Sequence, residues 1–229
     1  MQIDLHNFFK FYDENNPKHV AAVDQLEIDL FTKSQDLLQN ESNWIRIYRS
    51  KATPSTSVLD VPWFPQTDNY RDANRTCNSS SCAMCLEYLK PGTLKGEKGD
   101  DAYVQKVFAI GDSTDHTVQT KVLESYGVKS QFSYNLSFAD IDKSLSAGNP
   151  VVIGILHRGS LSSPTGGHMI VVSGKKGSDY VVNDPYGSLN DGYTGAVTNG
   201  RGAVYKKSEL TCRWLENGKD KTGWGRIFK

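Results

Sequence analysis

The spacing of apolar residues divides the chain into a short first part and a long second part. Asn16-Pro17 offers an N-cap followed by proline at the first helical position, a combination that begins a helix. Apolar residues then recur every three or four positions, as one packed face of a helix requires: Val20, Val23, Leu26, Leu30 and Phe31. Small polar residues over 50–57 suit a linker. We therefore expect an N-terminal helical appendage over residues 1–50, followed by a separate domain over residues 58–229.

Beyond residue 58 the apolar pattern alternates between the period of a helix and that of a strand. Helices are predicted over residues 78–90, 117–126 and 138–147. Strands are predicted where apolar runs are short and rich in β-branched residues: 150–156, 168–173, 180–183 and the tail near 224–228. The stretch after the first of these helices is polar and contains glycine, and we expect a loop there. Because helices come first and antiparallel strands later, the order predicts an α+β fold rather than a series of βαβ units.

Composition and charge exclude several classes of protein. The chain has 229 residues, of which 38% are hydrophobic, and a formal net charge of +0. A balanced charge argues against nucleic acid as the main partner, because phosphate binding calls for a basic excess. The N-terminus lacks the basic flank and apolar run of a signal peptide, and the longest apolar stretch, 150–156, is too short to cross a bilayer. We therefore expect a protein made in the cytoplasm, with no membrane insertion.

One of the four cysteines, Cys77, stands at the start of the first predicted helix of the domain. Small hydroxyl residues suited to N-capping accompany it, and Pro91-Gly92 ends the helix. A thiol there lies at the positive end of the helix dipole, which favours the thiolate, the form that attacks carbonyl groups. Cys77 is therefore the candidate nucleophile, whereas Cys82 and Cys85 fall on the apolar face of the helix.

A thiol nucleophile needs a base within hydrogen-bonding reach, and the base needs a group that orients it. Of the five histidines, His168 follows Gly166-Gly167, where missing side chains leave room for another segment to approach. If residues 175–177 form a three-residue hairpin loop, His168 lies directly opposite Asp184 on the same face of the sheet. Asp184 would then hold one imidazole nitrogen while the other meets Cys77. A loop of another length would break this pairing.

Acyl transfer also needs donors aimed at the developing oxyanion, commonly a backbone N–H and a side-chain amide. Gln66 precedes the Cys77 helix and follows a stiff, proline-bracketed segment over residues 61–65. We expect its amide to act beside the Cys77 backbone N–H. Three aromatic residues are candidates for the wall of a substrate groove, or equally for core packing: Trp63, Tyr70 and Tyr186.

Four stretches that carry these residues resemble the papain-like cysteine peptidases related to the family that processes bacteriocin leader peptides. In chain order they are Val61–Gln66, Thr76–Met84, Gly166–Gly174 and Tyr180–Pro185. The resemblance covers residues 58–228 and implies a papain-like fold, with Cys77 as the nucleophile and His168 as the base. It also implies that Asp184 orients the base and that Gln66 lines the oxyanion hole. Separately, residues 6–23 resemble the front of some phage-encoded lysis proteins, the endolysins.

Two other classes of function stay open on the sequence alone. The cysteines also follow the C-x4-C-x2-C spacing, with Cys212 far downstream, that holds an iron–sulfur cluster in plant-type ferredoxins. Such a cluster would need a loop around the iron, whereas the apolar spacing from Cys82 onward is helical. A peptidase-like fold that only binds its ligand would carry the same residues with an inert thiol. The favoured hypothesis is a cysteine peptidase that needs no metal or organic cofactor.

The expected substrate is a peptide. The sequence offers no transporter segment and no export signal, which argues against leader processing within a transporter. A phage-type endolysin that cuts the peptides of bacterial peptidoglycan, released to the cell wall during lysis, fits the N-terminal resemblance. The alternative is a cytoplasmic protease that acts on proteins.

Overall fold

The computed structural model describes Asn16, Lys18, His19, residues 58–96 and residues 98–229. The chain separates into two units, Met1–Pro54 and Ser55–Lys229, and the helices and strands named below belong to the second. The expected appendage over residues 1–50 therefore falls almost entirely outside the described residues. Within it, Asn16 Oδ1 accepts a hydrogen bond from the Lys18 backbone N–H at 3.0 Å, a contact typical of an N-cap. The domain boundary itself stays a prediction.

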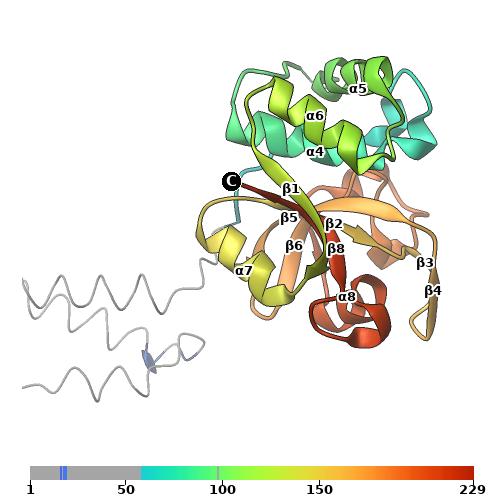
Figure 1. Cartoon of the computed structure of the whole chain (residues 1–229). Coiled ribbons are helices and arrows are strands. Elements are labelled where there is room, and N and C mark those ends of the chain that lie inside the picture. The colour runs from blue at the N-terminus through green and yellow to red at the C-terminus, as the bar shows by residue number, and fades with distance from the viewer. Residues whose placement is uncertain (1–15, 17, 20–57, 97) are drawn as a thin grey trace, which may run out of the picture. The chain divides into compact units, whose positions relative to one another are not determined.

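Three helices form one layer of the domain, at the top of Figure 1: α4 (Cys77–Leu89), α5 (Gly99–Ile110) and α6 (His116–Ser125). α4 is the central element of this layer, and its residues 78–86 are all buried. Burial on every side explains why residues 78–86 are small or apolar and include no charged side chain. Asp115 caps α6, because its side chain accepts the Thr117 backbone N–H at 2.7 Å.

Helix α5 occupies the stretch that the sequence predicted to be a loop, so that prediction was wrong. Its packed face consists of Tyr103, Val104 and Val107, which are fully buried. These few apolar residues stand among charged neighbours such as Asp101 and Lys106, and no helical period emerges from so short a pattern. Contact with the core, rather than local sequence, therefore accounts for this helix.

A six-stranded antiparallel sheet forms the other part of the domain, with strand order β1-β8-β2-β5-β6-β7 (Figure 1). Its strands are β1 (Ser130–Leu136), β2 (Val151–Ile155), β5 (His168–Lys176), β6 (Asp179–Asn183), β7 (Ala203–Tyr205) and β8 (Gly223–Phe228). The remaining elements are α7 (Phe138–Ser146), α8 (Lys207–Trp214) and a small hairpin of β3 (Arg158–Ser160) and β4 (Ser163–Thr165).

Side chains of the central strands alternate between two cores, as the pleat of a sheet requires. Val152 and Val171 belong to the core shared with α4, α5 and α6. Their neighbours Ile153 and Ile170 belong to the core shared with α7 and α8. The sheet therefore has helices on both faces, with α4 packed on β5. The predicted α+β fold, with the nucleophile helix against an antiparallel sheet, is confirmed.

The hairpin of β5 and β6 has a shorter turn than the sequence predicted. Lys176 pairs with Asp179, which leaves a two-residue loop, Gly177-Ser178, in place of the three-residue loop expected over 175–177. Gly177 has a φ of +62°, a left-handed conformation that tight hairpin turns require and that glycine adopts without strain. The predicted register is therefore wrong at the turn.

A bulge at Ser173 then changes the register once more. The Ser173 carbonyl accepts the Leu59 backbone N–H at 2.8 Å, so an incoming segment of chain uses a group at the irregular position. Beyond the bulge, the register continues so that Asp184, the residue after β6, lies opposite Ile170 and not opposite His168. The predicted direct pairing was wrong. The net offset is an even number of residues, however, so His168 and Asp184 still share one face.

Candidate active site

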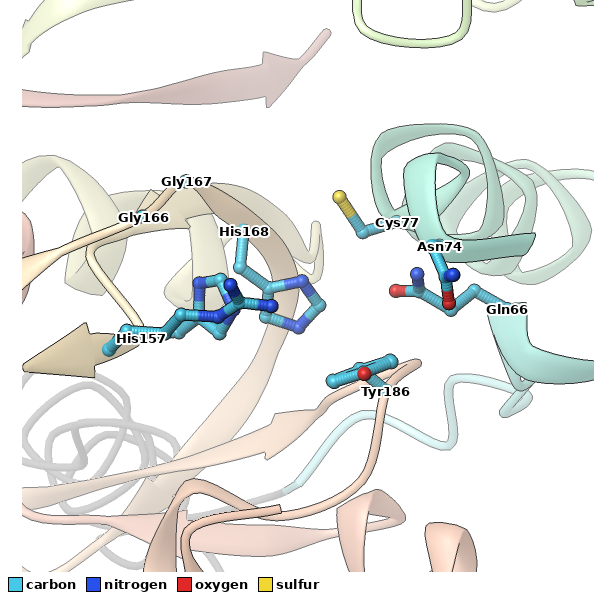
Figure 2. A pocket seen from close by; sticks show the side chains of 9 residues that line it. Gln66, Asn74, Cys77, His157, Gly166, Gly167, His168 and Tyr186 are labelled. Atoms are coloured by element: carbon cyan, nitrogen blue, oxygen red, sulfur yellow. The ribbon is translucent and has the colours of Figure 1, made fainter. Parts of the chain in front are cut away.

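A cleft of about 330 Å³ lies where the first turn of α4 meets the start of β5 (Figure 2). Gln66, Asn74 and Cys77 line it on the side of α4. The residues on the side of the sheet are His157, Arg158, Gly166, Gly167, His168 and Tyr186. Three of the four candidate site residues thus line one cleft, and the fourth, Asp184, lies fully buried behind His168.

Cys77 is the first residue of α4, but no side chain caps this helix. Thr76 stands at the N-cap position, and its hydroxyl donates to the Ala73 carbonyl at 3.1 Å instead of accepting from the first turn. The expected hydroxyl N-cap was therefore wrong, and the backbone N–H groups of the first turn are left to other partners. A hydrogen bond from the Ser81 hydroxyl to the Met169 carbonyl, at 3.1 Å, ties α4 to β5 next to the site.

The environment of Cys77 favours the thiolate. Burial is the largest influence and raises the pKa of its thiol. The interaction with His168 and its positive charge, together with the backbone N–H groups of Met169 and Asn78, outweigh burial and lower the pKa below its ordinary value. From the sequence, only the helix terminus was expected to lower the pKa of the Cys77 thiol. In the structure the imidazole of His168 and a backbone N–H of the neighbouring strand also lower it.

His168 is buried, and its ring is bonded to Asp184 and lines the cleft that Cys77 also lines. Its Nε2 lies 2.7 Å from Asp184 Oδ1, and the two side chains are 4% and 0% exposed. Burial by itself lowers the pKa of His168, but the charge and hydrogen bond of Asp184, together with Cys77, raise it well above its ordinary value. With Nε2 bonded to the carboxylate, Nδ1 is the nitrogen left for the sulfur. The pair is therefore set up as an imidazolium beside a thiolate.

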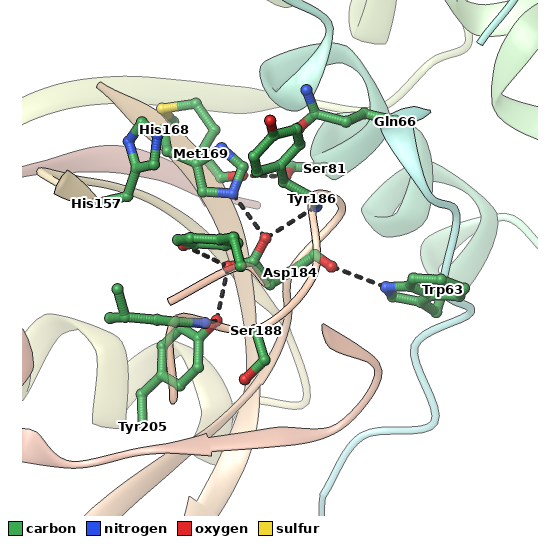
Figure 3. Close-up of polar contacts among 12 residues, drawn as sticks. Trp63, Gln66, Ser81, His157, His168, Met169, Asp184, Tyr186, Ser188 and Tyr205 are labelled. Atoms are coloured by element: carbon green, nitrogen blue, oxygen red, sulfur yellow. Dashed lines mark hydrogen bonds and ion pairs between the residues drawn. The ribbon is translucent and has the colours of Figure 1, made fainter. Parts of the chain in front are cut away.

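Asp184 is held by more donors than the sequence indicated (Figure 3). Its Oδ1 also accepts the Tyr186 backbone N–H at 3.0 Å. Its Oδ2 accepts the hydroxyl groups of Tyr205 at 2.7 Å and Tyr193 at 3.0 Å. Trp63, a candidate groove residue, instead donates from its indole nitrogen to the Asp184 carbonyl at 2.9 Å. These bonds fix the carboxylate and satisfy it as an anion.

The two tyrosines that hold the carboxylate were not singled out in the sequence. Burial, followed by the charge of Asp184, raises the pKa of both hydroxyl groups, so both stay protonated and donate. Nothing local marks them, because Tyr205 comes from β7 and Tyr193 from a loop, and only the fold brings them to Asp184. Of the other aromatic candidates, Tyr186 lines the cleft and Tyr70 is 56% exposed and does not.

Gln66 lies on the α4 side of the cleft, in the short 3₁₀-helix Gln66–Asp68. Its backbone N–H donates to the Pro185 carbonyl at 2.8 Å, and its Nε2 donates to the Ala73 carbonyl at 2.7 Å. Its Oε1 is buried without a hydrogen-bond partner among the described residues. An amide nitrogen carries two hydrogens, so one donor of Nε2 is still uncommitted. The oxyanion role of Gln66 stays a prediction.

Two of the other cysteines, Cys82 and Cys85, serve packing. Cys82 and Cys85 are fully buried on α4, and burial raises the pKa of both thiols. Within residues 58–96 and 98–229, no group of three or more histidine, cysteine, aspartate or glutamate side chains could hold a metal ion. Cys82 and Cys85 of the ferredoxin-like spacing thus lie on the buried face of a helix and not in a loop. No helix in the described part of the chain is long and apolar enough to cross a membrane.

Comparison with known proteins relates the chain to one protein family and to two solved structures. The model of the family described as "Peptidase_C39 like family" matches residues 58–222. No curated protein matches the chain. One similar solved structure is a double glycine motif protease from an AMS/PCAT transporter in complex with the leader peptide; it has 18% identity and a TM-score of 0.48, and the match covers 76% of this chain and 95% of that one. Another is a putative C39-like peptidase from Bacillus anthracis, with 12% identity, a TM-score of 0.48, and coverage of 75% and 96%.

Proposed function

The chain belongs to the Peptidase_C39-like family, and from this premise we propose that Cys77, His168 and Asp184 are its catalytic triad. Membership of the family makes the protein a cysteine peptidase, a hydrolase of peptide bonds. The observation that carries the proposal is the buried 2.7 Å hydrogen bond between His168 Nε2 and Asp184 Oδ1, with His168 and Cys77 lining the same cleft.

In this mechanism the Cys77 thiolate attacks the carbonyl carbon of a peptide bond. The His168 imidazolium then gives its proton to the leaving amine, which departs as the carbonyl re-forms on an acyl enzyme. Water attacks the acyl group next, with His168 taking a proton from it as base. Asp184 keeps the ring in the orientation and tautomer that both steps need, and it balances the positive charge on the imidazolium.

The oxyanion of each tetrahedral intermediate needs two donors near the sulfur. The Cys77 backbone N–H is one, because the first turn of a helix has no carbonyl acceptor of its own. The second is the free N–H of the Gln66 amide, whose nitrogen is held at 2.7 Å by the Ala73 carbonyl. A preorganised donor of this kind contributes about 10²- to 10³-fold to the rate. Gln66→Leu is expected to lower kcat by that factor.

Two alanine variants of the same helix test the nucleophile. Cys77→Ala is expected to abolish turnover, whereas Cys82→Ala removes a buried thiol of the same size outside the cleft and is expected to retain it. The opposite result, with Cys82 essential and Cys77 dispensable, would overturn the assignment. A binding protein without activity is the other outcome to separate. Such a protein would show a Cys77 thiol that reacts with alkylating agents only near the ordinary pKa of a free cysteine, about 8.5.

For the substrate we propose the peptides of bacterial peptidoglycan, cut in the manner of a phage-type endolysin. The support for this finer proposal is the resemblance of residues 6–23 to phage lysis proteins. The alternative substrate is protein, for a protease acting inside the cell.

Two incubations separate the substrates. The full chain is incubated with purified peptidoglycan and, in parallel, with an unfolded protein, and new free amines are measured against the Cys77→Ala variant. Amines released from peptidoglycan by the wild type alone support the cell-wall proposal. Amines released only from the unfolded protein remove it, and leave the peptidase mechanism intact.

A further inference from the structure

The side-chain amide of Gln66 is oriented by the carbonyl of Ala73. A carbonyl can only accept, so the 2.7 Å contact places the amide nitrogen, and not the amide oxygen, toward Ala73. The second hydrogen of that nitrogen is left for the cleft that Gln66 and Cys77 both line (Figure 2). A group that fixes the Ala73 carbonyl therefore also fixes the proposed oxyanion donor.

Thr76, the residue before Cys77, is the second group in contact with that carbonyl. Its hydroxyl lies 3.1 Å from the Ala73 oxygen, and the residue is fully buried. The two residues belong to one short stretch, in which the 3₁₀-helix Ala73–Arg75 leads directly to α4. The Thr76 hydroxyl thus joins the carbonyl that orients Gln66 to the start of the nucleophile helix.

The stretch around Ala73 is otherwise weakly held. The residues at positions 72, 74 and 75 are exposed. The ion pair of Arg75 with Asp112, at 3.0 Å, joins side chains that are 61% and 51% exposed, and pairs of this kind contribute little. Water does not compete for the buried hydroxyl of Thr76, so this contact is the one best suited to fix the Ala73 carbonyl.

A buried polar network lies behind the Thr76 hydroxyl. The side-chain amide of Asn69 lies 2.8 Å from Thr76 Oγ1 and 2.9 Å from Ser80 Oγ. Ser80 in turn donates to Asp100 Oδ2 at 2.6 Å. All four residues are buried. Burying so many polar groups costs free energy unless each has a partner, and a network whose members are paired holds them in one geometry.

The orientation of the Asn69 amide decides where the hydrogen of Thr76 points. A hydroxyl has one hydrogen, so Thr76 donates either to Ala73 or to Asn69. If the amide nitrogen faces Thr76, the hydroxyl accepts from it and donates to Ala73. The amide oxygen then lies 3.1 Å from Asp100 Oδ2, where only a protonated carboxyl can donate to it. If Asp100 is ionised, the amide turns its nitrogen to the carboxylate, and its oxygen takes the hydrogen of Thr76.

The surroundings of Asp100 favour its protonated form up to about neutral pH. Its Oδ1 is buried without a hydrogen-bond partner among the described residues, and a neutral carboxyl tolerates this better than an anion does. Burial raises the pKa of Asp100 to about 7; the hydrogen bond from Ser80 opposes this, and the negative charges of Asp68 and Asp101 add to it. In the protonated state the network directs the hydrogen of Thr76 to Ala73.

We propose that Thr76 is a positioning residue for the oxyanion hole, because its hydroxyl fixes the Ala73 carbonyl that orients Gln66. Asn69 and the proton on Asp100 direct the hydrogen of that hydroxyl. This role rests on the proposed function for the reaction and for the oxyanion donor. It adds a buried group that never touches the substrate and still sets the rate of acyl transfer.

Two small reagents separate the oxyanion hole from the nucleophile without a known substrate. p-Nitrophenyl acetate acylates the Cys77 sulfur through a tetrahedral oxyanion and releases p-nitrophenolate. Iodoacetamide alkylates the same sulfur with loss of iodide and forms no oxyanion. The ratio of the acylation rate to the alkylation rate therefore reports the oxyanion donors, because the thiolate fraction of Cys77 enters both rates and cancels. The rates in Cys77→Ala are subtracted as background.

Removal of the hydroxyl should lower this ratio. Thr76→Val and Thr76→Ala are each expected to lower it about three- to tenfold at about pH 6, the effect of one lost hydrogen bond. Thr76→Ser keeps the hydroxyl and should keep the ratio. Thr120→Val is the matched control, since Thr120 on α6 also donates to a backbone carbonyl, that of His116 at 3.0 Å, and lies outside the cleft. It should leave the ratio unchanged. An unchanged ratio in Thr76→Val and Thr76→Ala overturns the positioning role.

A double-mutant cycle distinguishes positioning from general damage to the site. Gln66→Leu should lower the ratio by itself, and Thr76→Val added to it should cause no further loss, because the hydroxyl acts through an amide that is no longer there. Losses that multiply overturn the proposal, since the hydroxyl would then act by another route. If Gln66→Leu alone leaves the ratio unchanged, the oxyanion donor of the proposed function is wrong and the role of Thr76 falls with it, while Cys77→Ala still decides the nucleophile.

The ratio measured against pH tests the part given to Asp100. In the wild type it should fall as pH rises through about 7, because the ionised carboxylate turns the Asn69 amide and Thr76 no longer donates to Ala73. Asp100→Asn carries a neutral amide that donates to Asn69 at any pH, so its ratio should lack this fall. Profiles of the same shape in the two proteins overturn the role of Asp100 in directing the hydrogen.

Discussion

The buried carboxylate of Asp184 depends on two phenol groups that are not equivalent. Its Oδ2 accepts from Tyr205 at 2.7 Å and from Tyr193 at 3.0 Å. Tyr205 is fully buried, and its hydroxyl also accepts the Leu189 backbone N–H at 2.8 Å. Tyr193 is only half-buried. Replacing each by phenylalanine removes one oxygen and keeps the ring, so the two variants isolate the hydroxyl groups.

The structure sets the expected losses. Tyr193→Phe removes one hydrogen bond to a charged group, which costs about 1.5–3 kcal/mol, and water reaching this half-buried site moves the loss toward the lower figure. Tyr205→Phe removes a bond of the same kind and also leaves the Leu189 N–H buried without an acceptor, which adds about 1–3 kcal/mol. We therefore expect a loss of about 2.5–6 kcal/mol for Tyr205→Phe.

Urea unfolding of the full chain, followed by tryptophan fluorescence, measures both losses. The free energy of unfolding should fall further for Tyr205→Phe than for Tyr193→Phe, by about 1 kcal/mol or more, with the slope against urea unchanged. Equal losses, or a larger loss for Tyr193→Phe, would refute the argument that the second contact of Tyr205 matters.

Three further changes should have measurable effects. Asp184→Asn removes the charge that keeps His168 protonated, so kcat/KM should fall by about 10²- to 10⁴-fold with circular dichroism unchanged, and a loss under about threefold would contradict its role. Burial raises the pKa of Asp100 to about 7. The folded state therefore binds this proton more tightly than the unfolded chain does. The free energy of unfolding of the wild type should fall as pH rises from about 4 to 7, by up to about 1.4 kcal/mol per pH unit, and Asp100→Asn should show a flatter profile. Parallel profiles of the two proteins would contradict the raised pKa of Asp100. Gly154→Ala should cost about 1–3 kcal/mol, because its Cβ would overlap the Trp224 indole, and equal thermal stability of mutant and wild type would count against that packing.

The elements with the most regular apolar pattern were predicted well from the sequence. The helix beginning near Cys77 and the strands over 150–156 and 168–173 match α4, β2 and β5 within a few residues. Elements stabilised mainly by tertiary contact were missed: α5, β1, β7 and α8 have short or interrupted apolar faces. Local pattern does not encode the neighbours that bury these faces.

In the candidate site, too, the residues with a local sequence signal were predicted and the features that depend on tertiary contact were not. Gln66, Cys77 and His168 could be proposed because each stands beside a local signal: a stiff segment, a helix start and a glycine pair. The strand pairing predicted for Asp184 was wrong. Because the register differs from the predicted one by an even number of residues, Asp184 still lies on the same face of the sheet as His168. Gly174, next to the bulge, is its local sign, but the neighbour that a Cβ there would meet, Val58, lies far away in the chain and is known only from the structure.

The residues around the proposed triad could not be predicted. Tyr205 and Arg213 bind partners 21 and 57 residues away in the chain, and Tyr193 binds Asp184, nine residues before it, from a loop. No feature of the neighbouring sequence distinguishes them from other aromatic or basic residues. Only in the folded chain do these hydroxyl and guanidinium groups meet a carboxylate or a carbonyl to bind.

The central claim is that His168 holds Cys77 as a thiolate, and the rate of Cys77 alkylation by iodoacetamide against pH tests it most directly. The account predicts a titration midpoint below the pKa of an ordinary cysteine, about 8.5, in the wild-type chain, and a midpoint at or above that value in His168→Phe. Coincident titrations of the two proteins would contradict it, because the imidazole would then have no effect on the pKa of the Cys77 thiol.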